Sequence, residues 1–201
     1  MWTDARVAQF RTRRNDPAFR DVDTWERCVI AAWMDGRLTR TVMDVGCGDG
    51  RLFDLWHKYA GSVIGIDGNA GQCRAAKQRA ASLGLHCQIL QRDFTHDTLP
   101  PADLAVCARI WAHLDEQAAD RLLDRLTQKT SRAILHINER NDSAEAAAIE
   151  AGGLHRLDSL PRIEVVLAAL GWRIADVRRL APWSTALFIY GDRATAREDN
   201  S

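Results

Sequence analysis

Three glycines at alternate positions follow a short apolar run early in the chain: Gly46, Gly48 and Gly50. The apolar run, Val42–Val45, contains one acid, Asp44. Glycine permits the positive φ angles of a sharp turn and lets a backbone approach a ligand closely. A second apolar run, Ser62–Ile66, is followed by Asp67. This order of strand, glycine loop, helix, strand and acid is typical of a βαβ unit that binds a nucleoside.

The spacing of the glycines and the charge beside them indicate which nucleoside cofactor fits. A dinucleotide fingerprint needs a third glycine where this chain has Arg51, and it places a pyrophosphate at the helix N-terminus. Asp44 suits a cationic amine better than an anionic pyrophosphate. S-adenosylmethionine (SAM) carries an ammonium group and a sulfonium, and no phosphate. The loop therefore favours SAM, and a nicotinamide-dependent reductase is the weaker alternative.

Strands and helices are expected to alternate around this loop. We predict strands over 41–46, 62–67, 86–91, 103–108 and 132–138, and helices over 50–59, 70–83, 116–129 and 160–170. The last two strand-like runs, 172–180 and 184–190, are joined by too few residues for a parallel crossover. The predicted fold class is therefore α/β, a Rossmann-like and mostly parallel seven-stranded sheet with helices on both faces and a C-terminal antiparallel hairpin.

The chain divides into three expected parts. Residues 1–40 hold an arginine-rich arm and a helix, which we expect to cover the active site. The helix is predicted from apolar residues at steps of three and four between Val22 and Trp33. Residues 41–192 form the predicted SAM-binding domain, and residues 193–201 form a polar tail that we expect to be disordered.

Composition argues against several classes of function. Lys plus Arg and Asp plus Glu both number 27, and a net charge of zero disfavours a long nucleic-acid surface. We find no apolar run long enough to cross a bilayer and no apolar signal core at the start, so we expect a cytoplasmic protein with no membrane partner. Five scattered cysteines without metal-ligand spacing fit reduced thiols and predict no metal site.

Residues 40–192 resemble the class I SAM-dependent methyltransferases, in the small-molecule type of that family. The segment Asp44–Gly50 is similar to the first motif of the family, and Leu170–Trp172 before the closing hairpin is similar to its usual ending. The resemblance implies that SAM is the methyl donor and that S-adenosylhomocysteine (SAH) is the product.

The acids near the ends of the first three predicted strands gain roles from this resemblance. It implies that Asp67 holds both ribose hydroxyls and that Asp93 takes the adenine amino group, although Asp67 could instead cap the following helix. It also brings Arg109 close to the methionine part of SAM. The complete set predicted to bind the cofactor is Asp44, Gly46, Cys47, Gly48, Asp67, Gly68, Asn69, Asp93, Phe94, Ala108 and Arg109.

The methyl acceptor has to be sought beyond the fourth predicted strand. Family members that methylate base amino groups resemble one another in an Asn/Asp-Pro-Pro-aromatic motif there, and this chain has Ala108–Trp111 instead. A small molecule with an O or N nucleophile is therefore the predicted substrate. The predicted substrate-binding residues are Trp111, His113, His155 and Arg156, and the predicted catalytic residues are His113 and His136.

Several interpretations stay open at this point. Trp111 could line the substrate pocket with its aromatic face or lie in the core. The polar stretch 139–158 is long for a plain connection and predicts a lid. An RNA or protein methyltransferase would be favoured by a basic cleft around Arg11–Arg20. A SAM-binding protein without catalysis is a further alternative, and a homodimer is compatible with the sequence.

Overall fold

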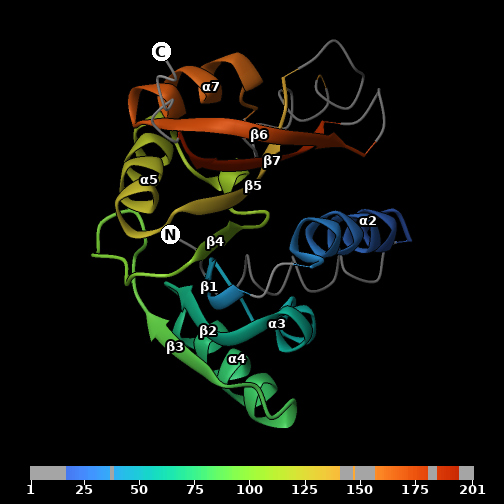
Figure 1. The fold of residues 1–201 in the computed structure, drawn as a ribbon. Helices are drawn as coiled ribbons and strands as arrows, with labels where there is room; N and C mark the ends of the chain where they lie inside the picture. Colours follow the sequence, from blue (N-terminus) through green and yellow to red (C-terminus); the bar gives the residue numbers. More distant parts are fainter. Residues whose placement is uncertain (1–16, 37–38, 141–146, 148–156, 181–184, 195–201) are drawn as a thin grey trace.

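The computed structural model describes residues 17–36, 39–140, 147, 157–180 and 185–194. Figure 1 shows one sheet through the middle of the molecule with helices packed on its faces. Within the described residues seven strands form this sheet, in the order β3-β2-β1-β4-β5-β7-β6. They are β1 (Thr39–Val45), β2 (Ala60–Asp67), β3 (Cys87–Gln91), β4 (Leu104–Cys107), β5 (Arg132–Asn138), β6 (Trp172–Arg179) and β7 (Ala186–Arg193).

Three of the described helices begin where a side chain caps the first turn. The helices are α2 (Pro17–Met34), α3 (Phe53–Tyr59), α4 (Ala70–Ser82), the 3-10 helix η1 (Trp111–His113), α5 (Glu116–Lys129) and α7 (Leu160–Ala169). Asn69, Asp115 and Ser159 each accept a hydrogen bond from a backbone N–H of the helix that follows. Such caps satisfy donors that the helix itself leaves unpaired. The local sequence therefore fixes where α4, α5 and α7 begin.

The pairing of the strands creates a crevice at one edge of the sheet. Strands β1 to β5 pair in parallel, whereas β7 runs antiparallel to both β5 and β6. The chain passes outward from β1 through β2 to β3 and then returns to the other side of β1 as β4. The point between β1 and β4 where the strand order reverses is where ligands bind in such sheets. The predicted fold class is confirmed.

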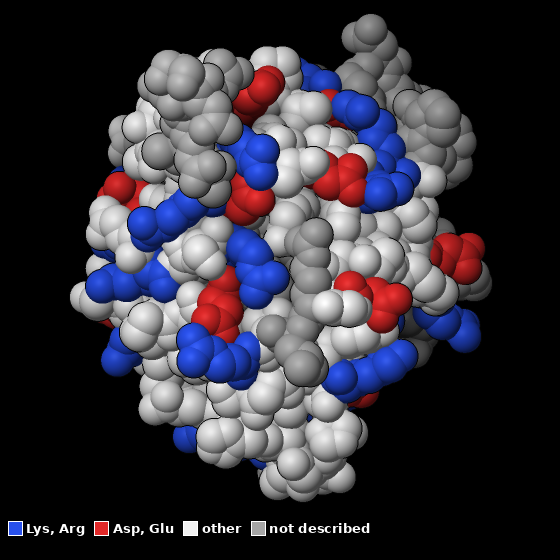
Figure 2. Space-filling view, in the orientation of Figure 1, with Lys and Arg blue, Asp and Glu red and all other residues white. Residues whose placement is uncertain are grey.

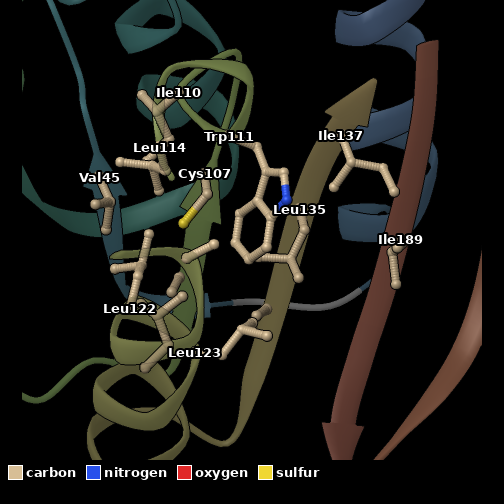
Figure 3. Close-up of a cluster of buried hydrophobic side chains, with 14 of the residues drawn as sticks. Val45, Cys107, Ile110, Trp111, Leu114, Leu122, Leu123, Leu135, Ile137 and Ile189 are labelled. Atoms are coloured by element: carbon tan, nitrogen blue, oxygen red, sulfur yellow. The ribbon is translucent and has the colours of Figure 1, made fainter. Parts of the chain in front are cut away.

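Two apolar layers hold the helices on the sheet. Side chains of α5 and α7 pack on one face, and side chains of α2, α3 and α4 pack on the other. Figure 2 shows basic and acidic side chains interleaved over one side of the molecule. Figure 3 shows part of the first layer, where Trp111 lies beside Leu135 of β5. No helix in the described ranges is long and apolar enough to cross a membrane.

The elements differ from the predicted ranges mainly at their ends. The helix expected from residue 50 begins at Phe53, because Gly50 has a φ of 80° and belongs to the preceding turn. Strand β7 continues to Arg193, which pairs with Trp172 of β6, so residue 193 is not part of the tail. The arm 1–16, most of the predicted lid, the turn 181–184 and the tail 195–201 lie outside the described residues.

Candidate active site

A cavity of about 510 Å³ lies at the carboxyl ends of β1 to β4. Volumes of this size accept a cofactor or small ligand. Every residue that was predicted to bind the cofactor lines this cavity, together with Arg51, Ile110, Arg121 and others. The crevice at the reversal of strand order is therefore hollow, and the predicted cofactor residues surround it.

The glycine loop is held against the end of β2. The backbone N–H groups of Gly46 and Cys47 both donate to the Ile66 carbonyl, at 2.7 and 3.0 Å. Gly46, Gly48 and Gly50 all have positive φ angles, of 70°, 58° and 80°. A Cβ atom at Gly46 would lie 2.1 Å from Cγ2 of Ile110, so glycine is required there for space as well as for conformation.

Asp67 ties the glycine loop to the start of α4. Its Oδ2 accepts from the Gly48 N–H at 3.0 Å, and its Oδ1 accepts from the Asn69 N–H at 2.8 Å. Burial raises the pKa of this carboxyl, against the opposing effect of the two N–H donors. The cap of α4 is Asn69, not Asp67. The carboxylate of Asp67 therefore sits at the loop and lines the cavity.

Asp44 is a buried carboxyl at the floor of the same cavity. Its side chain is 2% exposed, and its Oδ2 accepts a hydrogen bond of 2.8 Å from Nε1 of Trp56. Burial raises the pKa of Asp44 to about 6, although the Trp56 bond and the charge of Arg51 act in the other direction. A cation near Asp44 would favour its ionised form.

The loop after β3 presents an exposed acid. Oδ1 of Asp93 accepts from both the N–H and the hydroxyl of Thr95, at 2.9 and 2.6 Å. Burial acts to raise the pKa of Asp93, but the Thr95 hydrogen bonds outweigh it and hold the pKa below its ordinary value. Phe94 beside it is partly buried against the core. Asp93 is thus an ionised acceptor at the rim of the cavity.

The turn after β4 contacts Glu26 of α2, a residue that was not predicted from the sequence to belong to the site. Nε of Arg109 donates to Oε2 of Glu26 on α2, at 2.7 Å. Nη2 of Arg51, at the end of the glycine loop, donates to the other oxygen of Glu26, at 2.8 Å. The sequence contains one sign that Glu26 is buried. It lies four residues after Val22 and three before Val29, and so it falls on the apolar stripe of its helix.

The two aromatic candidates after β4 separate in the structure. His113 lines the cavity. Trp111 is wholly buried, and its Nε1 donates to Oδ2 of Asp158 at 2.9 Å. The interpretation of Trp111 as a wall of the substrate pocket is therefore wrong for this cavity, since its ring fills the core between η1 and β5 (Figure 3).

His136, which was also predicted to be catalytic, does not line the cavity. Its ring is buried and stacks on Phe188, with centroids 4.3 Å apart. Burial lowers its pKa to about 4, against the opposing charge of Glu26, so the ring is neutral at pH 7. The alternation of β5 turns this side chain toward the layer of α2. His155 and Arg156 lie outside the described residues.

The described part of the chain has no group of three or more His, Cys, Asp and Glu side chains that could hold a metal ion. The cavity instead offers carboxylates, backbone donors and the two arginines. Residue types of this kind can bind a ligand that carries hydroxyl groups and a cation.

Comparisons with known proteins agree with this geometry. Residues 42–132 match a family model described as a methyltransferase domain. The ubiquinone biosynthesis O-methyltransferase of Pseudomonas paraeruginosa is 28% identical over 137 residues, which cover 65% of this chain and 59% of that protein. The chain thus spans about three fifths of the length of this curated relative.

Several solved methyltransferase structures share this fold. The magnesium protoporphyrin IX methyltransferase of Synechocystis PCC 6803, solved with bound SAH, has a TM-score of 0.73 at 18% identity, over 92% of this chain and 98% of that one. The mitomycin 7-O-methyltransferase MmcR has a TM-score of 0.70 at 19% identity, over 92% of this chain and 60% of that one. Residues 42–132, which run from β1 to the start of β5, thus match a methyltransferase domain, and the chain has the fold of these solved methyltransferases.

Proposed function

We propose that this protein transfers the methyl group of SAM to an O or N nucleophile of a small molecule. The observation that carries the proposal is the meeting of three acids, Asp44, Asp67 and Asp93, around one cavity at the reversal of strand order. Each acid comes from the end of a different strand, and each matches a chemical feature of SAM. Asp44 faces the cationic end, Asp67 the ribose hydroxyls and Asp93 the adenine amino group.

The residues of the cavity fit the cofactor without a pyrophosphate site. An anionic pyrophosphate bound here would be repelled by the buried carboxylate of Asp44, whereas an ammonium group would form an ion pair with it. SAM, when bound, supplies a methyl group that its sulfonium has already activated. The protein then has to align the acceptor and exclude water. His113 lines the cavity, so we propose His113 rather than His136 as the base for an acceptor that must lose a proton.

Two observations support a small molecule as the acceptor. The names of two relatives describe O-methyltransferases, one of ubiquinone biosynthesis and one that acts on mitomycin. Ubiquinone and mitomycin are both small molecules. The charges on the face in Figure 2 are mixed, whereas an RNA substrate is held by clustered positive charge. The basic segment that would favour RNA lies largely outside the described residues. The homodimer and the cytoplasmic location stay predictions.

Calorimetric titration tests the cofactor directly. We expect SAM and SAH to bind and NADH not to bind. Asp67→Ala should weaken SAH binding by about 1–3 kcal/mol, the scale for losing hydrogen bonds to a charged group. Asp124→Ala removes an exposed acid of α5 that does not line the cavity, and it should leave the affinity unchanged. NADH binding without SAM binding would contradict the proposal, and SAM binding without turnover on any acceptor would favour a non-catalytic protein.

The pKa of Asp44 predicts how cofactor affinity depends on pH. The pKa of about 6 lies above the ordinary value of 3.8, so the ligand-free fold gains stability as pH falls through 6 and Asp44 takes up a proton. The ammonium of SAM needs the ionised form. Affinity for SAH should therefore drop by about tenfold between about pH 7 and pH 5, one unit below that pKa.

Titrations in buffers of different ionisation enthalpy should also detect a proton released on binding below about pH 6. Asp44→Asn is the matched control, because it keeps the shape of the side chain and removes the titrating group. In that variant the affinity for SAH should be lower at pH 7 and should vary less with pH. An affinity of the unmodified protein that stays flat across this range would remove Asp44 from the cationic end of the site.

A further inference from the structure

The N-terminal helix α2 carries a carboxylate that is wholly buried. Glu26 is 0% exposed, and its two oxygens accept hydrogen bonds from Arg51 at 2.8 Å and from Arg109 at 2.7 Å. Burial acts to raise the pKa of Glu26, but the charges of the two arginines outweigh it, so the carboxylate stays ionised. A buried charge persists in a fold only where partners of opposite charge hold it. The position of Glu26 is thus set by both arginines, and it sets theirs.

The two arginines belong to two different segments of the cavity wall. Arg51 closes the glycine loop after β1, and Arg109 forms the turn after β4. Both line the cavity, whereas no described residue of α2 does. Glu26 therefore joins the two strand ends on either side of the reversal of strand order from behind the cavity wall.

The backbone of Arg109 shows that this turn is held under constraint. Its φ is 62°, and within the described ranges it is the one non-glycine residue with a positive φ. An L-residue adopts this conformation only when its surroundings impose it, and such residues cluster where ligands are clamped. The bond from Nε of Arg109 to Glu26 is an interaction of this side chain that can impose it.

The charges around Glu26 largely balance one another. Asp23 pairs with Arg27 and Arg51, and Arg27 also donates to Asp54 on α3, at 2.9 Å. The network holds three acids and four arginines: Asp23, Glu26, Asp54, Arg27, Arg51, Arg79 and Arg109. The acids offset all of these arginines but one, and Arg79 is 40% exposed to solvent, so the network adds little net field to the cavity. Its effect on a ligand is one of geometry.

We propose that Glu26 is a positioning residue for the methionine half of the cofactor. It holds Arg51 and Arg109, and with them the backbone of the glycine loop and of the turn after β4. The adenosine half lies against Asp67 and Asp93, which follow β2 and β3. Within the described residues, the hydrogen bonds of these two carboxylates go to Gly48, Asn69 and Thr95 and not to α2. The inference rests on the proposed function, since it assumes that SAM occupies the cavity.

A comparison of two ligands separates the halves of the cofactor. SAH contains the methionine-derived half, whereas 5′-methylthioadenosine keeps the adenosine and sulfur and lacks the amino-acid part. In the Glu26→Gln variant we expect SAH to bind about tenfold more weakly, as for one weakened charged hydrogen bond to a ligand. The affinity for 5′-methylthioadenosine should change by less than about twofold. Calorimetry of the full chain gives both constants.

Asp54→Asn is the matched control. Asp54 belongs to the same network, but its described partners, Arg27 and Arg79, do not line the cavity. It should lower thermal stability slightly and leave both affinities unchanged. If Glu26 had a purely structural role, Glu26→Gln would weaken the binding of both ligands equally. The ratio of the two dissociation constants would then stay unchanged, and that result overturns the inference.

Two further outcomes keep this test decisive. If Glu26→Gln fails to fold, Asp23→Asn replaces it, because Asp23 is about a quarter exposed and touches the same arginines. Asp23→Asn should also weaken the binding of SAH more than that of 5′-methylthioadenosine, by a smaller factor than Glu26→Gln. An unchanged ratio of the two dissociation constants would overturn the inference. If the unmodified protein binds neither ligand, the proposed function itself fails. If it binds both and the variants lose both alike, only the role of Glu26 fails.

Discussion

Replacing Trp111 by alanine is expected to destabilise the fold by about 3–5 kcal/mol, the range for removing a large buried aromatic ring. The side chain is wholly buried in the layer between η1, α5 and β5 (Figure 3). Its Nε1 also donates to Asp158, which is itself buried and bound by Arg162 at 2.8 and 2.9 Å. Alanine would leave a cavity and would remove one donor from that carboxylate. Urea unfolding followed by circular dichroism measures the loss.

Trp111→Phe separates packing from hydrogen bonding. Phenylalanine keeps most of the ring volume and removes the donor to Asp158, so we expect a loss of about 1–3 kcal/mol. The order of stability should be unmodified protein, then phenylalanine, then alanine. If Trp111→Ala loses less than about 1 kcal/mol and yet abolishes methyl transfer, the side chain is a wall of the substrate pocket after all.

Trp111 also illustrates why the sequence could not settle this part of the site. An aromatic residue just after a strand end can turn into the crevice or back into the core, and the local pattern is the same in both cases. What decides between them is Asp158, which lies 47 residues further along the chain. The same holds for His136, whose direction follows the alternation of β5 and the stacking on Phe188.

The fold itself was predictable because its signals are local. Apolar runs bounded by glycine or polar residues mark the strands, and the caps Asn69, Asp115 and Ser159 mark helix starts. The alternation of strands and helices then leaves few topologies open. The ends of elements were less accurate, because Gly50 has a positive φ that continues the turn to residue 52.

The cofactor side of the cavity was predictable for a related reason. Its residues follow directly after strands, and the carboxyl ends of parallel strands meet at one edge of the sheet. Glu26 was not found in this way, because its partner Arg109 is 83 residues distant and α2 carries no motif. An acid on the apolar stripe of a helix indicates that a partner of opposite charge is buried beside it, but the local sequence does not identify that partner.

Gly46→Ala is expected to have the second large effect, because two independent costs meet at one position. An alanine at a φ of 70° costs about 1–2 kcal/mol in any surroundings. The new Cβ would also lie 2.1 Å from Cγ2 of Ile110, whose side chain is only 7% exposed and has little room to move. Overpacking of this kind adds about 1–3 kcal/mol, for a total of roughly 2–5 kcal/mol.

Gly84→Ala separates the two costs. Gly84 has a similar φ of 61°, but a Cβ there would meet nothing within 4 Å, so this variant carries the conformational cost alone. The difference in unfolding free energy between the two variants measures the contact with Ile110. Because Gly46 and Ile110 both line the cavity, Gly46→Ala should also weaken SAH binding, whereas Gly84→Ala should not. Equal losses of stability in the two variants would show that the glycine loop can shift away from Ile110, and that the close approach does not constrain the loop.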